Sequence, residues 1–148
     1  MRRVLSIGLV SLMLLSFMSP VSGEDEPLGW VESAGGFDED YIAGHVVMDD
    51  GSIVVAGEFT SAIMFDDTGL GSVGINGDKD AFIASMNTTG NWTGAINFGS
   101  NGDDGINAIT LHPSGDIFVV GFFCFGTAGE ACEMNISSFT LNKDDDNG

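Results

Sequence analysis

Residues 106–123, INAITLHPSGDIFVVGFF, hold two apolar runs separated by a tight polar turn at Pro113-Ser114-Gly115. The stretch occurs twice, because a shift of 64 positions aligns it with residues 42–59, IAGHVVMDDGSIVVAGEF. A self-match at a period of tens of residues is the mark of a repeat architecture. The shift pairs Asp40 with Asp104, Gly51 with Gly115, Ile53 with Ile117, Val55 with Val119, Gly57 with Gly121 and Phe59 with Phe123.

The chain around the repeated stretch has the pattern of β-strands. From Trp30 on, no window shows the i, i+3, i+4 apolar spacing of a helix, whereas short runs rich in Val, Ile and Phe alternate with Gly, Asp and Asn clusters. This pattern predicts an all-β protein. In residues 52–59 and 116–123 apolar side chains fall on both faces of the predicted strand, so we expect both strands to lie between neighbouring sheets.

The predicted strands form two units. The first unit is a meander of four antiparallel strands with a long loop at residues 60–79, and the second begins with the repeated hairpin and adds a third strand at residues 135–141. Residues 30–36 are similar to the fourth strand of the first unit and are predicted to be an orphan outer strand. The other predicted strands are residues 42–48, 52–59, 80–86 and 92–98 in the first unit, and 106–111 and 116–123 in the second.

The string from Gly57 to Phe123 resembles the secreted β-propeller repeats often called SBBP repeats. Their pattern is a G-x-F strand end, D-x-F-x-A-x-x-N, a G-x-x-W turn, a G-x-x-x-D-D segment and a G-x-I/V-x-V-x-G hairpin. The chain matches this pattern, with one residue instead of two between Gly90 and Trp92, at Gly57, Phe59, Asp80, Phe82, Ala84, Asn87, Gly90, Trp92, Gly99, Asp103, Asp104, Gly115, Ile117, Val119 and Gly121.

The resemblance implies four-stranded antiparallel propeller blades within a repeat region at residues 30–148. The first blade spans residues 41–99, and the second, incomplete blade spans residues 105–148. Because propellers close with about four blades or more, we expect further blades from a longer polypeptide or, alternatively, self-association of copies. The repeated aromatic residues are expected to pack between blades rather than to stack on carbohydrate, and ligands are expected at the loops 60–79 and 124–132.

The N-terminus predicts export. Residues 1–23 contain Arg2-Arg3, an apolar run and a small-residue end at Val21-Ser22-Gly23, which is typical of a signal peptide. An uncleaved membrane anchor is the alternative. Residues 24–29 form an acidic spacer, and we expect a secreted or cell-surface protein with no stable membrane span after cleavage.

Acidic residues dominate the charge. The formal net charge is −18, and all 22 acidic residues follow Gly23. Such a field repels phosphate backbones, which excludes nucleic acid as a partner. The acidity is typical of a solvated, salt-adapted surface, but it also allows a Ca²⁺ site near Asp38, Asp40, Asp103 and Asp104. The alternative role for Asp40 and Asp104 is to accept hydrogen bonds in turns.

The cysteines and the sequons fit an exported protein. Cys124 and Cys132 flank a short loop and are predicted to form a local disulfide in an oxidising compartment. Three sequons permit glycosylation at Asn87, Asn91 and Asn135.

No catalytic constellation can be identified in the sequence. His45 and His112, the two histidines, are not equivalent under the shift, so a repeated metal site or base is not indicated. No phosphate loop or nucleophile elbow is present. We therefore expect a non-catalytic module without a required cofactor that binds a protein or glycan ligand. The alternative is the propeller portion of a secreted enzyme whose active site lies outside this chain.

Overall fold

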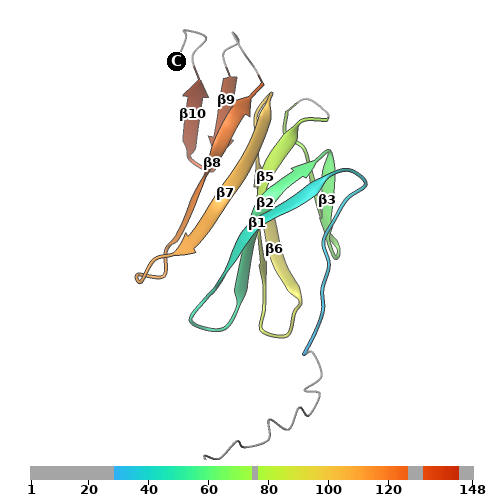
Figure 1. The fold of residues 1–148 in the computed structure, drawn as a ribbon, viewed down its shortest axis with the longest axis vertical. Coiled ribbons are helices and arrows are strands. Elements are labelled where there is room, and N and C mark those ends of the chain that lie inside the picture. The colour runs from blue at the N-terminus through green and yellow to red at the C-terminus, as the bar shows by residue number, and fades with distance from the viewer. Residues whose placement is uncertain (1–28, 75–76, 127–131, 144–148) are drawn as a thin grey trace, which may run out of the picture.

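A computed structural model of the chain describes residues 29–74, 77–126 and 132–143, and every regular element in these ranges is a β-strand (Figure 1). All strand pairs are antiparallel. The predicted all-β fold is therefore confirmed. The strands are β1 (Asp40–Val47), β2 (Ile53–Thr60), β3 (Ala62–Phe65), β4 (Thr68–Gly71), β5 (Lys79–Met86), β6 (Trp92–Phe98), β7 (Asp103–Leu111), β8 (Ile117–Phe125), β9 (Cys132–Ile136) and β10 (Phe139–Lys143).

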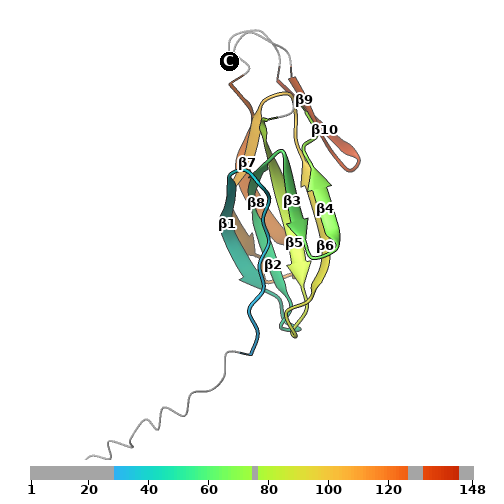
Figure 2. The same cartoon turned by 90° about the vertical axis from the view of Figure 1, so that its right-hand side faces the viewer.

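The first unit, β1 to β6, is built on a four-stranded sheet with the order β1-β2-β5-β6. This is the predicted meander, and its strands differ from the predicted bounds by only a few residues. The loop predicted at residues 60–79 contains a hairpin of its own, β3 and β4, because Phe65 and Thr68 pair across a tight turn at Asp66-Asp67. The hairpin folds back onto one face of the sheet (Figure 2).

The second unit, β7 to β10, stacks on the opposite face of that sheet. Strand β7 lies against β1, β2 and β5, and β8 pairs with β7 on its outer side (Figure 1). The four-stranded sheet is thus covered on both faces, as the apolar pattern of β2 predicts. Val54 and Ala56 of β2, which point to the face covered by β7, are 8% and 0% exposed.

The repeat seen in the sequence is also a repeat of backbone geometry. Both first hairpins turn at a glycine with positive φ, +82° at Gly51 and +88° at Gly115. Both first strands change register at the same place, between Ile42 and Gly44 in β1 and between Ile106 and Ala108 in β7. These positions differ by the 64 residues of the sequence repeat. A shared bulge is a specific feature of a strand pair, so the two hairpins are copies of one structural element.

Two apolar layers form the core of the fold, one inside the first unit and one between the units. The first layer lies between the four-stranded sheet and the β3–β4 hairpin, and Phe59, Phe65 and Phe82 at its centre are at most 1% exposed. The second layer lies between the sheet and the second unit, where Ala56 and Phe98 meet Ile106. Burial of large apolar side chains is the main favourable term in folding, so the stacking of the units depends on the second layer.

Three expectations from the sequence need correction. Residues 135–141 are not a third strand, because the chain reverses at Ser137, whose φ is +54°, and forms the β9–β10 hairpin. Residues 30–36 form no strand, and their only bridge joins Gly35 to Met64. Both faces of β8 are apolar, but Phe118 and Val120 on its outer face are 55% and 62% exposed, and Val119 on the other face is 41% exposed. The His112 ring contacts Phe118, but no sheet among the described residues covers the outer face of β8.

Replacing Phe98 by Ala is expected to lower the free energy of unfolding by about 3–5 kcal/mol, because the side chain fills the layer between the units. Urea unfolding of the two proteins measures the loss. Ile96→Ala on the same strand is the matched control, since Ile96 is 59% exposed, and we expect a change below about 1 kcal/mol. Equal effects of the two substitutions would contradict the packing described above.

Candidate functional site

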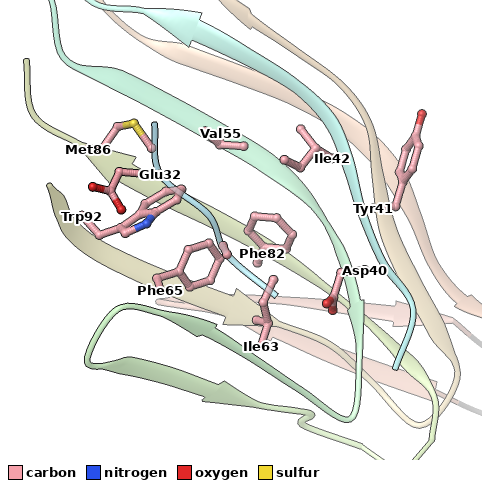
Figure 3. Close-up of a pocket in the computed structure, with 11 residues that line it drawn as sticks. Glu32, Asp40, Tyr41, Ile42, Val55, Ile63, Phe65, Phe82, Met86 and Trp92 are labelled. Carbon is pink, nitrogen blue, oxygen red and sulfur yellow. The ribbon is translucent and has the colours of Figure 1, made fainter. Parts of the chain in front are cut away.

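The aromatic pocket is a cavity of about 230 Å³ on the face of the four-stranded sheet that carries the β3–β4 hairpin. Strands β1, β2 and β5 form its floor, β3 and the start of β6 form one wall, and the segment before β1 lies across it (Figure 3). Its apolar lining belongs to the buried cluster between the four-stranded sheet and the β3–β4 hairpin. Its lining consists of Glu32, Ala34, Asp40, Tyr41, Ile42, Val55, Ile63, Phe65, Phe82, Met86 and Trp92.

Three aromatic rings give the pocket its character. The ring of Phe65 lies with its centroid 5.3 Å from that of Phe82 and 4.8 Å from that of Trp92, the latter edge to face. Such pairs are favourable beyond their buried area, so the rings form a rigid wall. The indole Nε1 of Trp92 is buried and has no hydrogen-bond acceptor among the described residues.

Two carboxylates give the aromatic pocket an acidic rim. Glu32 is exposed, and Figure 3 shows its carboxylate on the same side of the pocket as the Trp92 indole. Asp40 is held in place because its Oδ2 accepts a hydrogen bond of 2.6 Å from the Gly36 amide. Tyr41, 59% exposed, stands at the opposite side. The pocket can hold an apolar ring and attract a positive charge, and its lining includes no Ser, Thr, Cys, His or Lys side chain.

A second carboxylate, equivalent to Asp40 in the repeat, is fully buried. Asp104 is 0% exposed, and its Oδ2 accepts a 2.7 Å hydrogen bond from the Ser100 amide, as Asp40 does from Gly36. Its Oδ1 accepts a 3.0 Å bond from the Cys124 amide. Burial raises the pKa of Asp104, and these hydrogen bonds oppose the shift. Asp104 therefore ties the chain before β7 to the end of β8.

Asp80, at the start of β5, is a third carboxyl group in the protein interior. It is 0% exposed, its Oδ2 accepts a hydrogen bond from the Val73 amide, and its Oδ1 has no partner among the described residues. Burial raises its pKa to about 6, with smaller contributions from Asp104 and Asp78, while the bond from Val73 acts in the opposite direction. No local pattern in the sequence predicts a perturbed carboxyl group at this position.

The structure separates the four residues of the predicted Ca²⁺ site into two pairs. Asp40 and Asp104 accept hydrogen bonds from the backbone, whereas Asp38 and Asp103 line one open hollow of about 670 Å³. Asp103 Oδ1 also accepts a 3.1 Å bond from the Lys79 amide. Within residues 29–74, 77–126 and 132–143, no three His, Cys, Asp or Glu residues form a group that could hold a metal ion. Ca²⁺ binding stays a prediction.

Cys124 and Cys132 lie at disulfide distance, with an S–S separation of 1.99 Å, in agreement with the predicted disulfide. The link joins the end of β8 to the start of β9, so it anchors the β9–β10 hairpin beside the second layer. The residues between them at 127–131 lie outside the described ranges.

The predicted glycosylation sites lie in or next to turns. Asn87 and Asn91 are hydrogen-bonded to Thr89 in the turn between β5 and β6. Asn135 in β9 is exposed and donates to Glu133. Asn91 is also exposed and Asn87 is half-buried. Glycosylation of all three stays a prediction.

The two histidines lie apart from the aromatic pocket. His45 belongs to β1, and His112 belongs to the exposed turn between β7 and β8. His112 Nδ1 lies 2.7 Å from Ser114 Oγ, and that hydroxyl donates a 2.5 Å bond to Asp116. This order differs from that of a catalytic triad, in which the carboxylate orients the histidine and the serine donates to the ring. The arrangement stabilises a turn.

Comparison with protein-family models, with curated proteins and with solved structures gives no match for this chain. Among the described residues there is also no helix of the length and hydrophobicity needed to cross a membrane. The case for a function therefore depends on the geometry of the chain itself.

Substituting Asp80 by Asn is expected to change how stability depends on pH. The folded-state pKa of about 6 lies above the ordinary value of 3.8, so the folded protein binds the proton more tightly than the unfolded chain. Asp80 therefore destabilises the fold progressively as the pH rises from about 4 to about 7, by about 3 kcal/mol in total. Asn retains the acceptor for Val73 but does not ionise.

Urea unfolding of both proteins between pH 4 and pH 7 measures this effect. We expect the Asp80→Asn protein to gain stability relative to the original chain as the pH rises. Asp49→Asn, in the exposed turn after β1, provides the control for loss of one negative charge. A stability difference that does not vary with pH would show that Asp80 is not perturbed.

Proposed function

We propose that this chain is an exported, non-catalytic module of β-propeller-type repeats that binds a protein or glycan ligand outside the cell or at the cell surface. The observation that carries the proposal is the face-to-face stacking of two units that share a hairpin, a bulge and a carboxylate cap at a spacing of 64 residues. Face-to-face stacking of antiparallel sheets is the arrangement of propeller blades.

The segment before β1 supports the same assignment. The Gly36 amide donates a hydrogen bond to Asp40, and the Ser100 amide donates one to Asp104. Residues 34–36 therefore precede the first strand of the first unit in the same way as residues 98–100 precede the first strand of the second unit. Gly35 bridges β3 of the first unit, and β6, which ends at Phe98, lies against β9 of the second. We propose that residues 30–36 take the place of the last strand of a preceding blade.

The outer face of the β7–β8 hairpin is an exposed apolar surface on which a further unit could pack. Phe118 and Val120 correspond in the repeat to Val54 and Ala56, which the second unit covers. Contiguous exposed apolar residues on a sheet mark an interaction surface. We propose that a following blade covers this face, from a longer polypeptide or from another copy of the chain.

The ligand-binding role fits the acidity and the export signal. The chain carries a net charge of −18 with few cations, and the predicted signal peptide at residues 1–23 lies outside the described ranges. The aromatic pocket is lined mainly by apolar side chains that can hold a ligand, which supports a binding role. Loop 60–79, expected at the sequence level to bind ligands, supplies Ile63 and Phe65 to that pocket.

The double substitution Phe118→Ser, Val120→Ser tests the uncovered face. In the purified exported chain we expect either a native mass above that of a monomer or strong binding of a hydrophobic dye, and we expect the double variant to reduce either signal several-fold. Ile96→Ser, at an equally exposed position on β6, is expected to leave both signals unchanged. A monomer that does not bind the dye would refute the proposed blade interface.

A screen of the immobilised exported chain against glycans and cell-surface proteins tests the binding role. A saturable ligand is the expected result. Turnover of ester, glycoside or peptide substrates by the purified chain would contradict a non-catalytic role.

A further inference from the structure

The aromatic pocket has a counterpart in the second unit. A crevice of about 170 Å³, here called the second crevice, lies between the units and is lined by residues that include Phe98, Ile106, Val119, Met134 and Ile136. Four positions in the linings of the two cavities correspond under the 64-residue shift, and β3 contributes to one cavity as β9 contributes to the other. The matching pairs are Ala34 with Phe98, Tyr41 with Gly105, Ile42 with Ile106 and Val55 with Val119.

One difference between the cavities concerns an aromatic ring. In the second crevice the phenyl ring of Phe98 packs against Ile106 and Met134 and is 9% exposed. At the same place in the aromatic pocket stands Ala34, which is exposed and carries only a methyl group. The amides of residues 36 and 100 are held by equivalent carboxylates, although Phe98 ends strand β6 whereas Ala34 lies outside the strands. The aromatic pocket therefore lacks the ring that Phe98 adds to the wall of the second crevice, and it is the larger cavity, at about 230 Å³ against about 170 Å³.

The size of the aromatic pocket fits one ring with a short side chain. A dry apolar cavity of about 150 Å³ binds benzene, and drug-sized ligands need about 300 Å³ or more. The volume of about 230 Å³ lies between these limits. Phe65 and Phe82, each 1% exposed, already hold their positions without a ligand.

The charges at the rim favour a cation on that side chain. Glu32 and Asp40 both line the pocket, and no cationic side chain does. Trp92 lines it too, and the face of an indole attracts an ammonium group. An ammonium group placed beside the ring would meet both kinds of partner, whereas a carboxylate on the ligand would be repelled.

We propose that the aromatic pocket binds an arylalkylamine, that is, a single aromatic ring carrying an ammonium group on a short chain. The ring of the ligand lies beside Ala34, Phe65 and Phe82, and the ammonium group lies between Glu32 and the Trp92 indole. The inference names the class of ligand for the proposed binding role, and its biological meaning rests on that proposed function. The existence of the pocket does not depend on that function.

Calorimetric titration of the purified exported chain with phenethylamine tests the proposal. We expect saturable binding with one site per chain and a dissociation constant in the millimolar range or tighter. Propylbenzene, the neutral analogue of similar shape, is expected to bind more weakly. Glu32→Gln should weaken phenethylamine binding about two- to fivefold and leave propylbenzene binding unchanged, whereas Asp49→Asn, in a turn away from the pocket lining, should alter neither.

Ala34→Phe places a phenyl ring at the pocket wall, where Phe98 stands in the second crevice, and is the decisive variant. We expect it to weaken binding of both compounds several-fold without lowering the melting temperature, whereas Ser33→Phe, which adds the same ring at a neighbouring exposed position outside the pocket lining, should leave binding unchanged. Absence of phenethylamine binding, or binding that Ala34→Phe does not weaken, would overturn the proposal. If another copy of the chain covers the pocket instead, phenethylamine fails to bind while the native mass exceeds that of a monomer, which refutes this inference but not the proposed function.

Discussion

The arrangement of the chain depends on one buried carboxylate, that of Asp104. It is removed from water, where an unpaired charge would be costly, and it is compensated by hydrogen bonds from Ser100 and from the Cys124 amide. These bonds fix the chain between β6 and β7 and join it to the end of β8. The direction of the chain between the two units is therefore defined, and Ile106 packs against the face of the four-stranded sheet. Asp40 holds the entry to the first unit through Gly36 in the same way.

This repeated cap accounts for both cavities and both apolar layers. Once the cap sets the path of the chain, residue 98 meets β7 and β9, and residue 34 meets β1 and β3. Residue 98 places a phenyl ring in the layer between the units, where a crevice of about 170 Å³ remains. Residue 34 places a methyl group beside the aromatic pocket of about 230 Å³. The side chains at these equivalent positions thus contribute to the difference between a packing contact and a candidate binding site.

Much of the fold could be predicted from the sequence, because the strand pattern and the turn glycines are local signals. The all-β fold, the four-stranded meander and the β7–β8 hairpin follow from apolar runs separated by Gly51 and Gly115. The β3–β4 and β9–β10 hairpins were missed, because their turns use Asp66 and Ser137 at positive φ, which carry no glycine signal. The aromatic pocket could not be predicted either, since its lining depends on which distant segments lie near Ala34 in space. By contrast, the repeat in the sequence pairs Asp40 with Asp104 and predicts a structural or Ca²⁺-binding role for both.

The central claim is that two copies of one unit stack face to face. Methyl–methyl nuclear Overhauser effects in a methyl-labelled chain test it most directly, because they report distances between side chains on different units. We expect cross-peaks from Ile106 of β7 to Ala56 and Ala81 of the four-stranded sheet, which belong to one buried cluster. An Ile106 methyl group that shows contacts only within its own hairpin would contradict the stacking of the units.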